Sequence, residues 1–344
     1  MSAVNTLAVA GPVDWVSSAL ERISANDSAV LVMITEDAGS TPRDAGAWIL
    51  VDREATLGTL GGGQLEQIAE DAAKEFLDDP RRGRRSTLRC VLGPDARQCC
   101  GGAVKLALEL LDANAAPWLK KAADSIQSDT DDAVLFPTRD VSATPRVISA
   151  SRSVSPASGV HLQSLRDPRP RLFLFGAGHV GRSLCTIASQ LPLRLVALDS
   201  RDAMRALVPR ADNVTVCDMV EPEICVRSIP RNAAVLVMTH SHELDYELCR
   251  ALLKRDDLAF IGLIGSHSKA ARFRHRLRKD GISPQATDGL TSPIGGSGPT
   301  SKEPGVIALS ALTEILTVFE ELGTTNQIEV NSQSDSVSNQ QGKQ

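Results

Sequence analysis

The sequence has no uninterrupted apolar stretch near the roughly 20 residues that a membrane-spanning helix needs. Its first residues also lack the basic start, apolar core and small-residue cleavage site of a secretory signal. Its apolar runs have the length of strands and stand beside glycines and charged residues. We therefore expect a soluble, cytoplasmic protein with no membrane partner.

The sequence has no excess of basic residues, since its formal net charge is −5. This balance argues against general attraction to nucleic acid. Only the run RRGRR at 81–85 is locally basic. We interpret it as a solvated loop, and the alternative is a contact for an anionic ligand or partner.

The seven cysteines contain no C-x-x-C pair, so a structural zinc site is not indicated. They are odd in number and scattered, and a chain of 344 residues does not need disulfides to fold. This usage also fits the cytoplasm. Only Cys99 and Cys100 stand out, because two glycines follow them.

A chain of this length with 42% hydrophobic residues has room for two domains. We predict a small α+β domain over 1–125 and a second domain over 171–325. The segment 126–170 is rich in Ser, Asp, Pro and Thr, which favours a linker with some local structure, either a hinge or a loop packed on one domain. Residues 326–344 are polar and predicted to be disordered.

The first domain shows mixed periodicity. We expect a helix over about 14–28, strands over 30–35 and 47–52, and a helix after the glycine-rich turn at 55–63. The apolar spacing at 104–111 suits either a strand or a helix.

From residue 171, short apolar strands alternate with helices. This order predicts a parallel sheet covered by helices on both faces. A helix from about Gly305 to Glu321 closes the domain.

The stretch LFLFGAGHVGRS (172–183) places G-x-G-x-x-G between a predicted strand and a helix. Gly176 permits the tight turn, Gly178 lets a phosphate approach the backbone, and Gly181 lets helix and strand pack closely. The helix N-terminus presents N–H groups to an anion. Asp199 ends the next strand, near the offset of a ribose-binding acid. These features predict a Rossmann-like domain.

A Rossmann-like fold does not by itself make a dehydrogenase, which also needs a general acid or base. His179 lies in the glycine loop and faces phosphate. His240, His242 and Asp245 have loose spacing for a metal site, and a polar turn at a strand end explains them better. Nothing else in the sequence points to a partner for hydride transfer.

Three stretches of the first domain look constrained beyond packing. GSTPR (39–43) carries Arg43, whose guanidinium suits a phosphate. GTLGGGQLE (58–66) leads three glycines into a helix, which favours a backbone cradle for an anion, while Glu66 in the first turn suits the helix dipole. QCCGG (98–102) places two thiols beside backbone amides that lower a thiol pKa. A plain turn is the alternative for each stretch.

Together with VMTHSHELD, FIGLIGSHSKAARF and LTSPIG…SKEPGVIALS, these motifs occur in an order that resembles the XdhC/CoxI family of xanthine dehydrogenase accessory proteins. The resemblance covers about 30–111 and 171–320. The segment LTSPIGGSGPTSKEPG is richer in Gly and Ser than is usual for the family, which puts the contacts of this loop in question.

The resemblance implies an N-terminal XdhC/CoxI-type α+β domain followed by a Rossmann-like domain, in a chaperone and not an enzyme. Such a protein binds molybdenum cofactor (molybdopterin), supports its sulfuration by a cysteine desulfurase, and delivers it to xanthine dehydrogenase or a related molybdenum hydroxylase. A homodimer is expected. By analogy, Cys99 and Cys100 are candidates for touching molybdenum or its sulfur. The candidate cofactor-binding residues are Ser40, Thr41, Arg43, Gly61, Gly62, Gly63, Glu66, Cys99, Cys100, Gly176, Gly178, His179, Gly181, Asp199 and His240.

The alternative functions are an NAD(P)-dependent oxidoreductase and a nucleotide-sensing accessory protein. Asp199 favours NAD over NADP because a carboxylate repels a 2′-phosphate. Arg201 acts in the opposite direction, so the residues leave this choice open.

Overall fold

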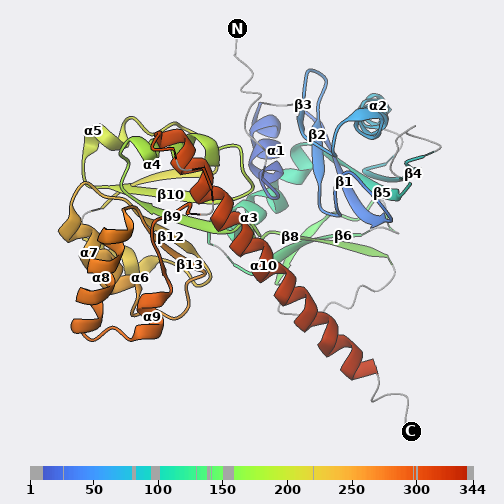
Figure 1. The fold of residues 1–344 in the computed structure, drawn as a ribbon. Coiled ribbons are helices and arrows are strands. Elements are labelled where there is room, and N and C mark those ends of the chain that lie inside the picture. Colours follow the sequence, from blue (N-terminus) through green and yellow to red (C-terminus); the bar gives the residue numbers. More distant parts are fainter. Residues whose placement is uncertain are drawn as a thin grey trace. The chain divides into compact units, whose positions relative to one another are not determined.

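The computed structural model describes residues 11–338 except 26, 80–82, 94–100, 129, 138–139, 141, 150–158, 220, 297 and 300, and it describes side chains up to residue 323. The chain divides into two compact units, an N-terminal unit (Ala10–Pro168) and a C-terminal unit (Arg169–Gln344) (Figure 1). Among the described helices, none combines the length and apolar character needed to cross a bilayer.

The N-terminal unit is built on a five-stranded antiparallel sheet in the order β3-β2-β1-β5-β4. The strands at 30–35 and 47–52 are confirmed, and the segment at 104–111, which the sequence left open, is a strand. The strands are β1 (Ala29–Ala38), β2 (Trp48–Val51), β3 (Thr56–Gly58), β4 (Arg85–Val91) and β5 (Ala103–Leu111).

Alternate residues of β1 face opposite sides of this sheet. Leu31 and Met33 join the core with α1 (Trp15–Ser24) and α3 (Ala116–Gln127), which follows a short 3₁₀ turn. Val30 and Val32 pack instead with α2 (Gly63–Asp78). The sheet therefore carries a hydrophobic core on each face.

The segment that the sequence assigned to a linker forms a second antiparallel sheet in the order β7-β6-β8 and belongs to the N-terminal unit. Phe136 on β6 packs its ring against Trp15 and Trp118, with centroids 6.4 and 5.9 Å apart. The apolar runs of this segment are short and separated by Ser- and Pro-rich stretches. Its composition therefore did not indicate that the segment contributes to a hydrophobic core. The strands are β6 (Asp132–Pro137), β7 (Arg146–Ser149) and β8 (Val160–Ser164).

The end of the basic run RRGRR is not a solvated loop, contrary to our interpretation. Arg85 is 2% exposed, and its Nε lies 2.6 Å from Glu109 Oε2. Its other donors reach the carbonyl oxygens of Pro137 and Ala143. Arg84 pairs with Asp112 at 2.7 Å. Both arginines are structural: Arg84 precedes β4 and Arg85 begins it, while their acidic partners lie in β5 (Glu109) and directly after it (Asp112).

The C-terminal unit contains a six-stranded parallel sheet in the order β11-β10-β9-β12-β13-β14. This confirms the expected Rossmann-like architecture. The strands are β9 (Arg171–Phe175), β10 (Arg194–Asp199), β11 (Val214–Asp218), β12 (Ala234–Val237), β13 (Phe260–Leu263) and β14 (Leu290–Thr291).

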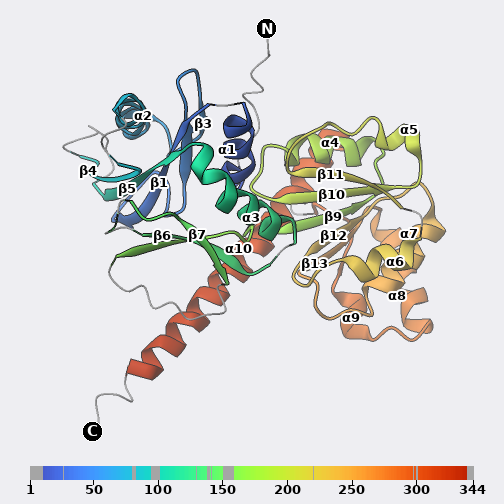
Figure 2. The ribbon, with the colours of Figure 1, turned by 180° about the vertical axis from the view of Figure 1, so that it is seen from behind.

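Helices cover both faces of the parallel sheet, as Figures 1 and 2 show. Leu172 and Leu174 of β9 belong to the core beneath α4 and α10. Phe173 and Phe175 belong to the opposite core beneath α6, α7 and α8. The helices are α4 (His179–Ala188), α5 (Asp202–Arg205), α6 (Pro222–Ser228), α7 (His242–Leu252), α8 (His267–Lys279), α9 (Pro284–Asp288) and α10 (Pro304–Ser338).

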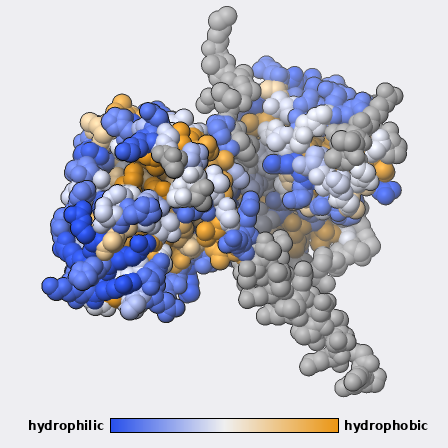
Figure 3. Space-filling view, viewed as in Figure 1, coloured by the Kyte–Doolittle hydropathy of each residue, from blue (hydrophilic) through white to orange (hydrophobic). Residues whose placement is uncertain are grey.

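Two features of these helices concern the surface and the chain end. The face of the C-terminal unit in Figure 3 is strongly hydrophilic over α8, whose 13 residues include six Lys or Arg side chains. Helix α10 is longer than the expected helix from Gly305 to Glu321 and continues over the first part of the expected tail. Residues 339–344 of that tail lie outside the described residues.

Candidate functional site

The glycine loop after β9 has the close contacts that its sequence predicts. Gly176 adopts φ +111°, and a Cβ there would lie 2.3 Å from the carbonyl oxygen of Met238. A Cβ on Gly181 would lie 2.2 Å from the carbonyl oxygen of Gly176. No described atom lies within 4 Å of a Cβ built on Gly178. Two glycines are therefore required by packing, and the third leaves open space at the start of α4.

This loop lies where the strand order reverses. The first strand of the unit, β9, has β10 on one side and β12 on the other. In open parallel sheets, ligands bind outside the carboxyl ends of the strands at such a switch point. Gly176 packs directly on Met238 and Thr239 at the end of β12. The loops after β9 and β12 thus form one edge.

Asp199, at the carboxyl end of β10, anchors the glycine loop. Its Oδ2 accepts hydrogen bonds from the Ala177 N–H at 2.8 Å and from Arg201 Nη2 at 2.7 Å. Its Oδ1 accepts from the backbone N–H and Nε of Arg201 at 2.9 and 2.8 Å. Burial raises the pKa of this carboxyl, but these bonds outweigh it and hold the pKa at about 2. Asp199 is ionised and bound within the protein.

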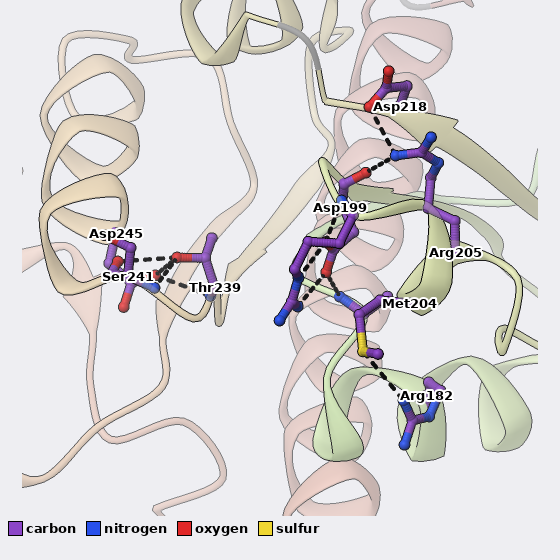
Figure 4. Close-up of polar contacts among 10 residues, drawn as sticks. Arg182, Asp199, Met204, Arg205, Asp218, Thr239, Ser241 and Asp245 are labelled. Carbon is purple, nitrogen blue, oxygen red and sulfur yellow. Dashed lines mark hydrogen bonds and ion pairs between the residues drawn. The ribbon is translucent and has the colours of Figure 1, made fainter.

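Arg205 adds a further set of contacts beside Asp199 (Figure 4). Its Nη1 donates to the carbonyl oxygen of Asp199 at 2.6 Å and to Asp218 Oδ1 at 2.8 Å, and its Nη2 contacts Asp202. Arg182 of α4 approaches Met204 Sδ at 3.6 Å. The guanidinium of Arg205 therefore binds acceptors of the protein itself, at and after the ends of β10 and β11.

A second polar cluster, around Asp245 at the start of α7, is also visible in Figure 4. Asp245 has no exposed surface. Its Oδ1 accepts from the N–H and Oγ1 of Thr239 at 2.9 and 2.8 Å, and its Oδ2 accepts from Lys269 Nζ at 2.7 Å. Lys269, which is 7% exposed, also donates to the carbonyl oxygen of Ile264 at 3.2 Å. This pair joins the loops after β12 and β13.

Sequence reasoning missed Lys269. The sequence did offer a signal, because Lys269 falls in the first turn of a predicted helix. A cation at that position is unfavourable with respect to the helix dipole, so its presence indicates a nearby acidic partner. Asp245, which the sequence grouped with His240 and His242, turns inward to Lys269 instead.

The histidines at this edge are exposed. His179, His242 and His267 are the first residues of α4, α7 and α8, and His240 lies in the loop before α7. Within the part of the chain that the structure describes, no three His, Cys, Asp or Glu side chains are close enough together to hold a metal ion.

In the N-terminal unit, described residues of the three constrained stretches meet at one edge of the five-stranded sheet. Gly102 donates its N–H to the carbonyl oxygen of Ser40 at 3.2 Å, and a Cβ on Gly102 would lie 2.5 Å from that oxygen. Gly61, at φ +102°, packs on Pro42 and Arg43, with a Cβ only 2.6 Å from Pro42 Cβ. Close packing and a backbone hydrogen bond therefore hold these loops against one another.

The backbone cradle at 59–63 already holds an anion, and that anion is Glu66. Its Oε2 accepts from the N–H groups of Leu60 and Gly62 at 2.8 and 3.2 Å and from Thr59 Oγ1 at 2.7 Å. Gly61 N–H is taken by Thr59 Oγ1 at 3.0 Å. Glu66 thus stabilises the loop, and α2 begins directly after it at Gly63.

Arg43 lies on the loop that packs against Gly61. Its side chain is exposed, and it has no polar partner among the residues that the structure describes. Ser40 is exposed and Thr41 half-buried on the same loop. Cys99 and Cys100 lie outside the described residues, while Gly102, two positions after Cys100, rests on Ser40. A guanidinium and two hydroxyls therefore stand on the loop that contacts the C-terminal end of QCCGG.

Two thiols of the C-terminal unit, Cys185 and Cys249, lack the environment of a reactive cysteine. Burial raises the pKa of Cys185 to about 12 and also raises the pKa of Cys249, which packs near Asp245. Both side chains are fully buried core residues. They are protonated at neutral pH and act as apolar packing groups.

Comparison with known families gives two matches along the chain. The model of the XdhC and CoxI family matches residues 22–89, and the model of the XdhC Rossmann domain matches residues 172–315. Together they cover more than half of the chain, in the order of the two units.

Comparison with individual proteins gives distant relatives. The chain is 24% identical over 291 residues to the uncharacterized protein YqeB of Escherichia coli, a match that covers 84% of this chain and 43% of that protein. It is 32% identical over 108 residues to a probable xanthine dehydrogenase subunit of Bacillus subtilis, covering 31% of this chain and 32% of that protein. The matched parts span less than half the length of either relative.

A solved structure shares the fold. The crystal structure of a xanthine dehydrogenase from Bacillus halodurans matches 90% of this chain and 96% of its own chain, with a TM-score of 0.68 and 22% sequence identity. The order of elements along the two units is therefore found in an experimental structure.

Proposed function

The chain belongs to the XdhC and CoxI family, and on that premise we propose that it is an accessory protein that binds molybdenum cofactor and delivers it to a molybdenum hydroxylase such as xanthine dehydrogenase. The observation that carries the proposal is the convergence of GSTPR, GTLGGG and the glycines of QCCGG at one edge of the N-terminal sheet. Such an edge supports ligand holding, because its loops are fixed by packing while the side chains of Ser40, Thr41 and Arg43 have no polar partner among the described residues.

The donor set at this edge fits a cofactor that carries a phosphate. Arg43 offers a guanidinium that matches a phosphate with two parallel hydrogen bonds, and Ser40 and Thr41 offer hydroxyl groups. Glu66 does not contribute to that binding, because its carboxylate occupies the N–H groups of the 59–63 loop. We therefore propose Ser40, Thr41 and Arg43 as the residues that hold the anionic end of the cofactor.

The glycine that ends QCCGG supports a role for its thiols in handling the metal end of the cofactor. Gly102 contacts Ser40 of the proposed phosphate-binding loop, and Cys100 stands two positions before Gly102 in the sequence. We propose that Cys99 or Cys100 contacts molybdenum or its terminal sulfur while a cysteine desulfurase supplies the sulfido ligand. A homodimer that presents this edge to the desulfurase and the hydroxylase completes the proposal, and no step of it requires catalysis by the chain itself.

Binding of released cofactor tests this function directly. Purified protein is mixed with cofactor, passed through gel filtration, and assayed for bound pterin by fluorescence. We expect Arg43→Ala to weaken retention by about tenfold, the loss of one good charge-assisted contact. Arg53→Ala is the matched control, since Arg53 is an exposed arginine of the same unit that pairs with Asp78. Retention by the unaltered protein no greater than that of an unrelated Rossmann protein would contradict the proposal.

One observation favours a nucleotide as a second ligand. The open space at Gly178, at the start of α4 and at the switch point of the parallel sheet, suits a diphosphate. We propose Gly176, Gly178, Gly181, His179 and His240 as the surroundings of that anion. An accessory protein that senses a nucleotide would use this edge without turnover.

A further inference from the structure

The carboxyl end of β10 is the place where dinucleotide-binding domains contact the ribose that carries the adenine. An acid there accepts a bond from the 2′-hydroxyl, and an arginine nearby accommodates a 2′-phosphate. This chain has both residue types, Asp199 and Arg201, and the sequence alone left the choice between them open. The hydrogen bonds of Asp199 decide it.

The carboxylate of Asp199 is saturated. An ionised carboxylate offers about four lone-pair positions, and Asp199 receives four hydrogen bonds of 2.7–2.9 Å, one from Ala177 and three from Arg201. A ribose hydroxyl therefore finds no vacant acceptor on this side chain. Reaching it requires breaking the bidentate pair with Arg201, in which the Asp199 side chain is only 3% exposed.

Arg201, by contrast, has N–H donors that its contacts with Asp199 do not use. A guanidinium has five N–H groups, and the contacts with Asp199 use only one on Nε and one on Nη2. Nη1 has no polar contact among the described residues, and 36% of the side chain is exposed. The neighbouring Arg205 cannot take the same role, because its Nη groups bind Asp199, Asp202 and Asp218.

We propose that Arg201, held in place by Asp199, makes this edge select a nucleotide that carries a phosphate on its ribose over one with free ribose hydroxyls. Asp199 is then a positioning residue that fixes both the guanidinium and the glycine loop through the Ala177 N–H. Arg201 is the specificity residue that touches the ligand. The proposal rests on the nucleotide that we proposed as a second ligand of this unit, and it is independent of pterin binding by the N-terminal unit.

Two minimal probes test the proposal on the full chain by isothermal titration calorimetry. Adenosine 2′,5′-bisphosphate carries the ribose phosphate, and adenosine 5′-monophosphate lacks it. We expect the bisphosphate to bind at least about tenfold more tightly, the value of one charge-assisted contact. In Arg201→Gln the preference disappears or reverses, because the phosphate loses its partner and the Asp199 carboxylate becomes free to accept a ribose hydroxyl.

Further variants locate the effect. Gly178→Ala adds a methyl group where no described protein atom lies within 4 Å, so the fold is retained and both nucleotides bind more weakly. Arg227→Gln removes an arginine that pairs with Glu223 on the surface of α6, and it leaves the preference unchanged. Arg201→Lys keeps the charge and most of the preference, which provides a readout even where the Gln variant does not fold.

Several results would overturn the proposal. These are equal affinities for the two nucleotides in the unaltered protein, tighter binding of the monophosphate, no measurable binding of either, or a preference that survives in folded Arg201→Gln. None of these results bears on pterin retention by the N-terminal unit, so the two proposals fail separately.

Discussion

Replacing Lys269 by Met removes one half of a buried ion pair while keeping an apolar stem of similar length. Lys269 is 7% exposed and Asp245 is completely buried, so Asp245 would keep a buried charge supported only by its two hydrogen bonds from Thr239. Removing one partner of such a pair costs about 3–5 kcal/mol of folding free energy. We expect a loss of this size in the free energy of unfolding of the C-terminal unit.

A second substitution recovers much of that loss. Asp245→Asn keeps an oxygen that accepts from Thr239 but removes the negative charge. Asp245→Asn alone leaves the Lys269 ammonium buried without a counter-charge, so it is also destabilising. In Asp245→Asn/Lys269→Met neither charge remains, and the double variant is expected to be more stable than the sum of the two single losses by about 2–3 kcal/mol.

The distribution of aromatic residues makes the measurement specific. All three tryptophans (Trp15, Trp48 and Trp118) lie in the N-terminal unit, whereas the single tyrosine, Tyr246, lies in the C-terminal unit. Urea unfolding followed by tryptophan fluorescence therefore reports the N-terminal unit. Far-UV circular dichroism reports both. The substitutions should shift the dichroism transition of the C-terminal unit and leave the fluorescence midpoint unchanged.

Two outcomes would refute this reasoning. Additive losses in the double variant would mean that the two side chains do not interact across their 2.7 Å contact. A Lys269→Met variant as stable as the unaltered protein would mean that the buried aspartate does not depend on a counter-charge.

Three other sites give further predictions. Burial raises the pKa of Glu109 to about 7 from 4.5, so the folded protein binds this proton more tightly than the unfolded chain does. The free energy of unfolding should therefore fall by up to about 3 kcal/mol as the pH rises through this interval. Glu109→Gln should make the free energy of unfolding less dependent on pH, as measured by urea titrations at several pH values. Gly181→Ala, whose Cβ would lie 2.2 Å from a carbonyl oxygen, should lower the free energy of unfolding by at least about 1–3 kcal/mol, whereas Gly178→Ala should leave thermal stability nearly unchanged. Glu66→Ala should loosen the 59–63 loop by removing the acceptor of two backbone N–H groups, detectable as faster amide hydrogen exchange at Leu60 and Gly62; unchanged exchange would argue against this anchoring.

Much of the C-terminal unit is predictable from sequence because its signals are local. Strand-length apolar runs followed by helices define a parallel sheet, and the spacing of Gly176, Gly178 and Gly181 marks the turn from β9 into α4. The contact of Gly181 with Gly176 is local and follows from the motif, whereas the contact of Gly176 with Met238 depends on the pairing of β9 with β12. The state of Asp199 does not follow from the motif either, because its saturation depends on the side-chain conformation of Arg201.

In the N-terminal unit, the features that the sequence did not predict depend on contacts between residues distant in the chain or on backbone conformation. The conformation of 104–111 depends on pairing with β1 and β4, so periodicity alone could not decide it. Glu66 was placed correctly in the first turn of α2, but its bonds to the preceding loop require the left-handed glycine conformations of that loop, such as φ +75° at Gly62. Arg85 was taken as solvated because its partner Glu109 is far along the chain.

The second sheet of the N-terminal unit has a consequence for where the chain can be divided without breaking a hydrophobic core. A recombination event near residue 125 would separate Trp118 from Phe136 and Arg85 from the carbonyl oxygens of Pro137 and Ala143. It would leave a half-built core in both products. A crossover between Pro168 and Arg169 cuts neither core, so inherited shuffling of the two units with other partners is expected to use that junction.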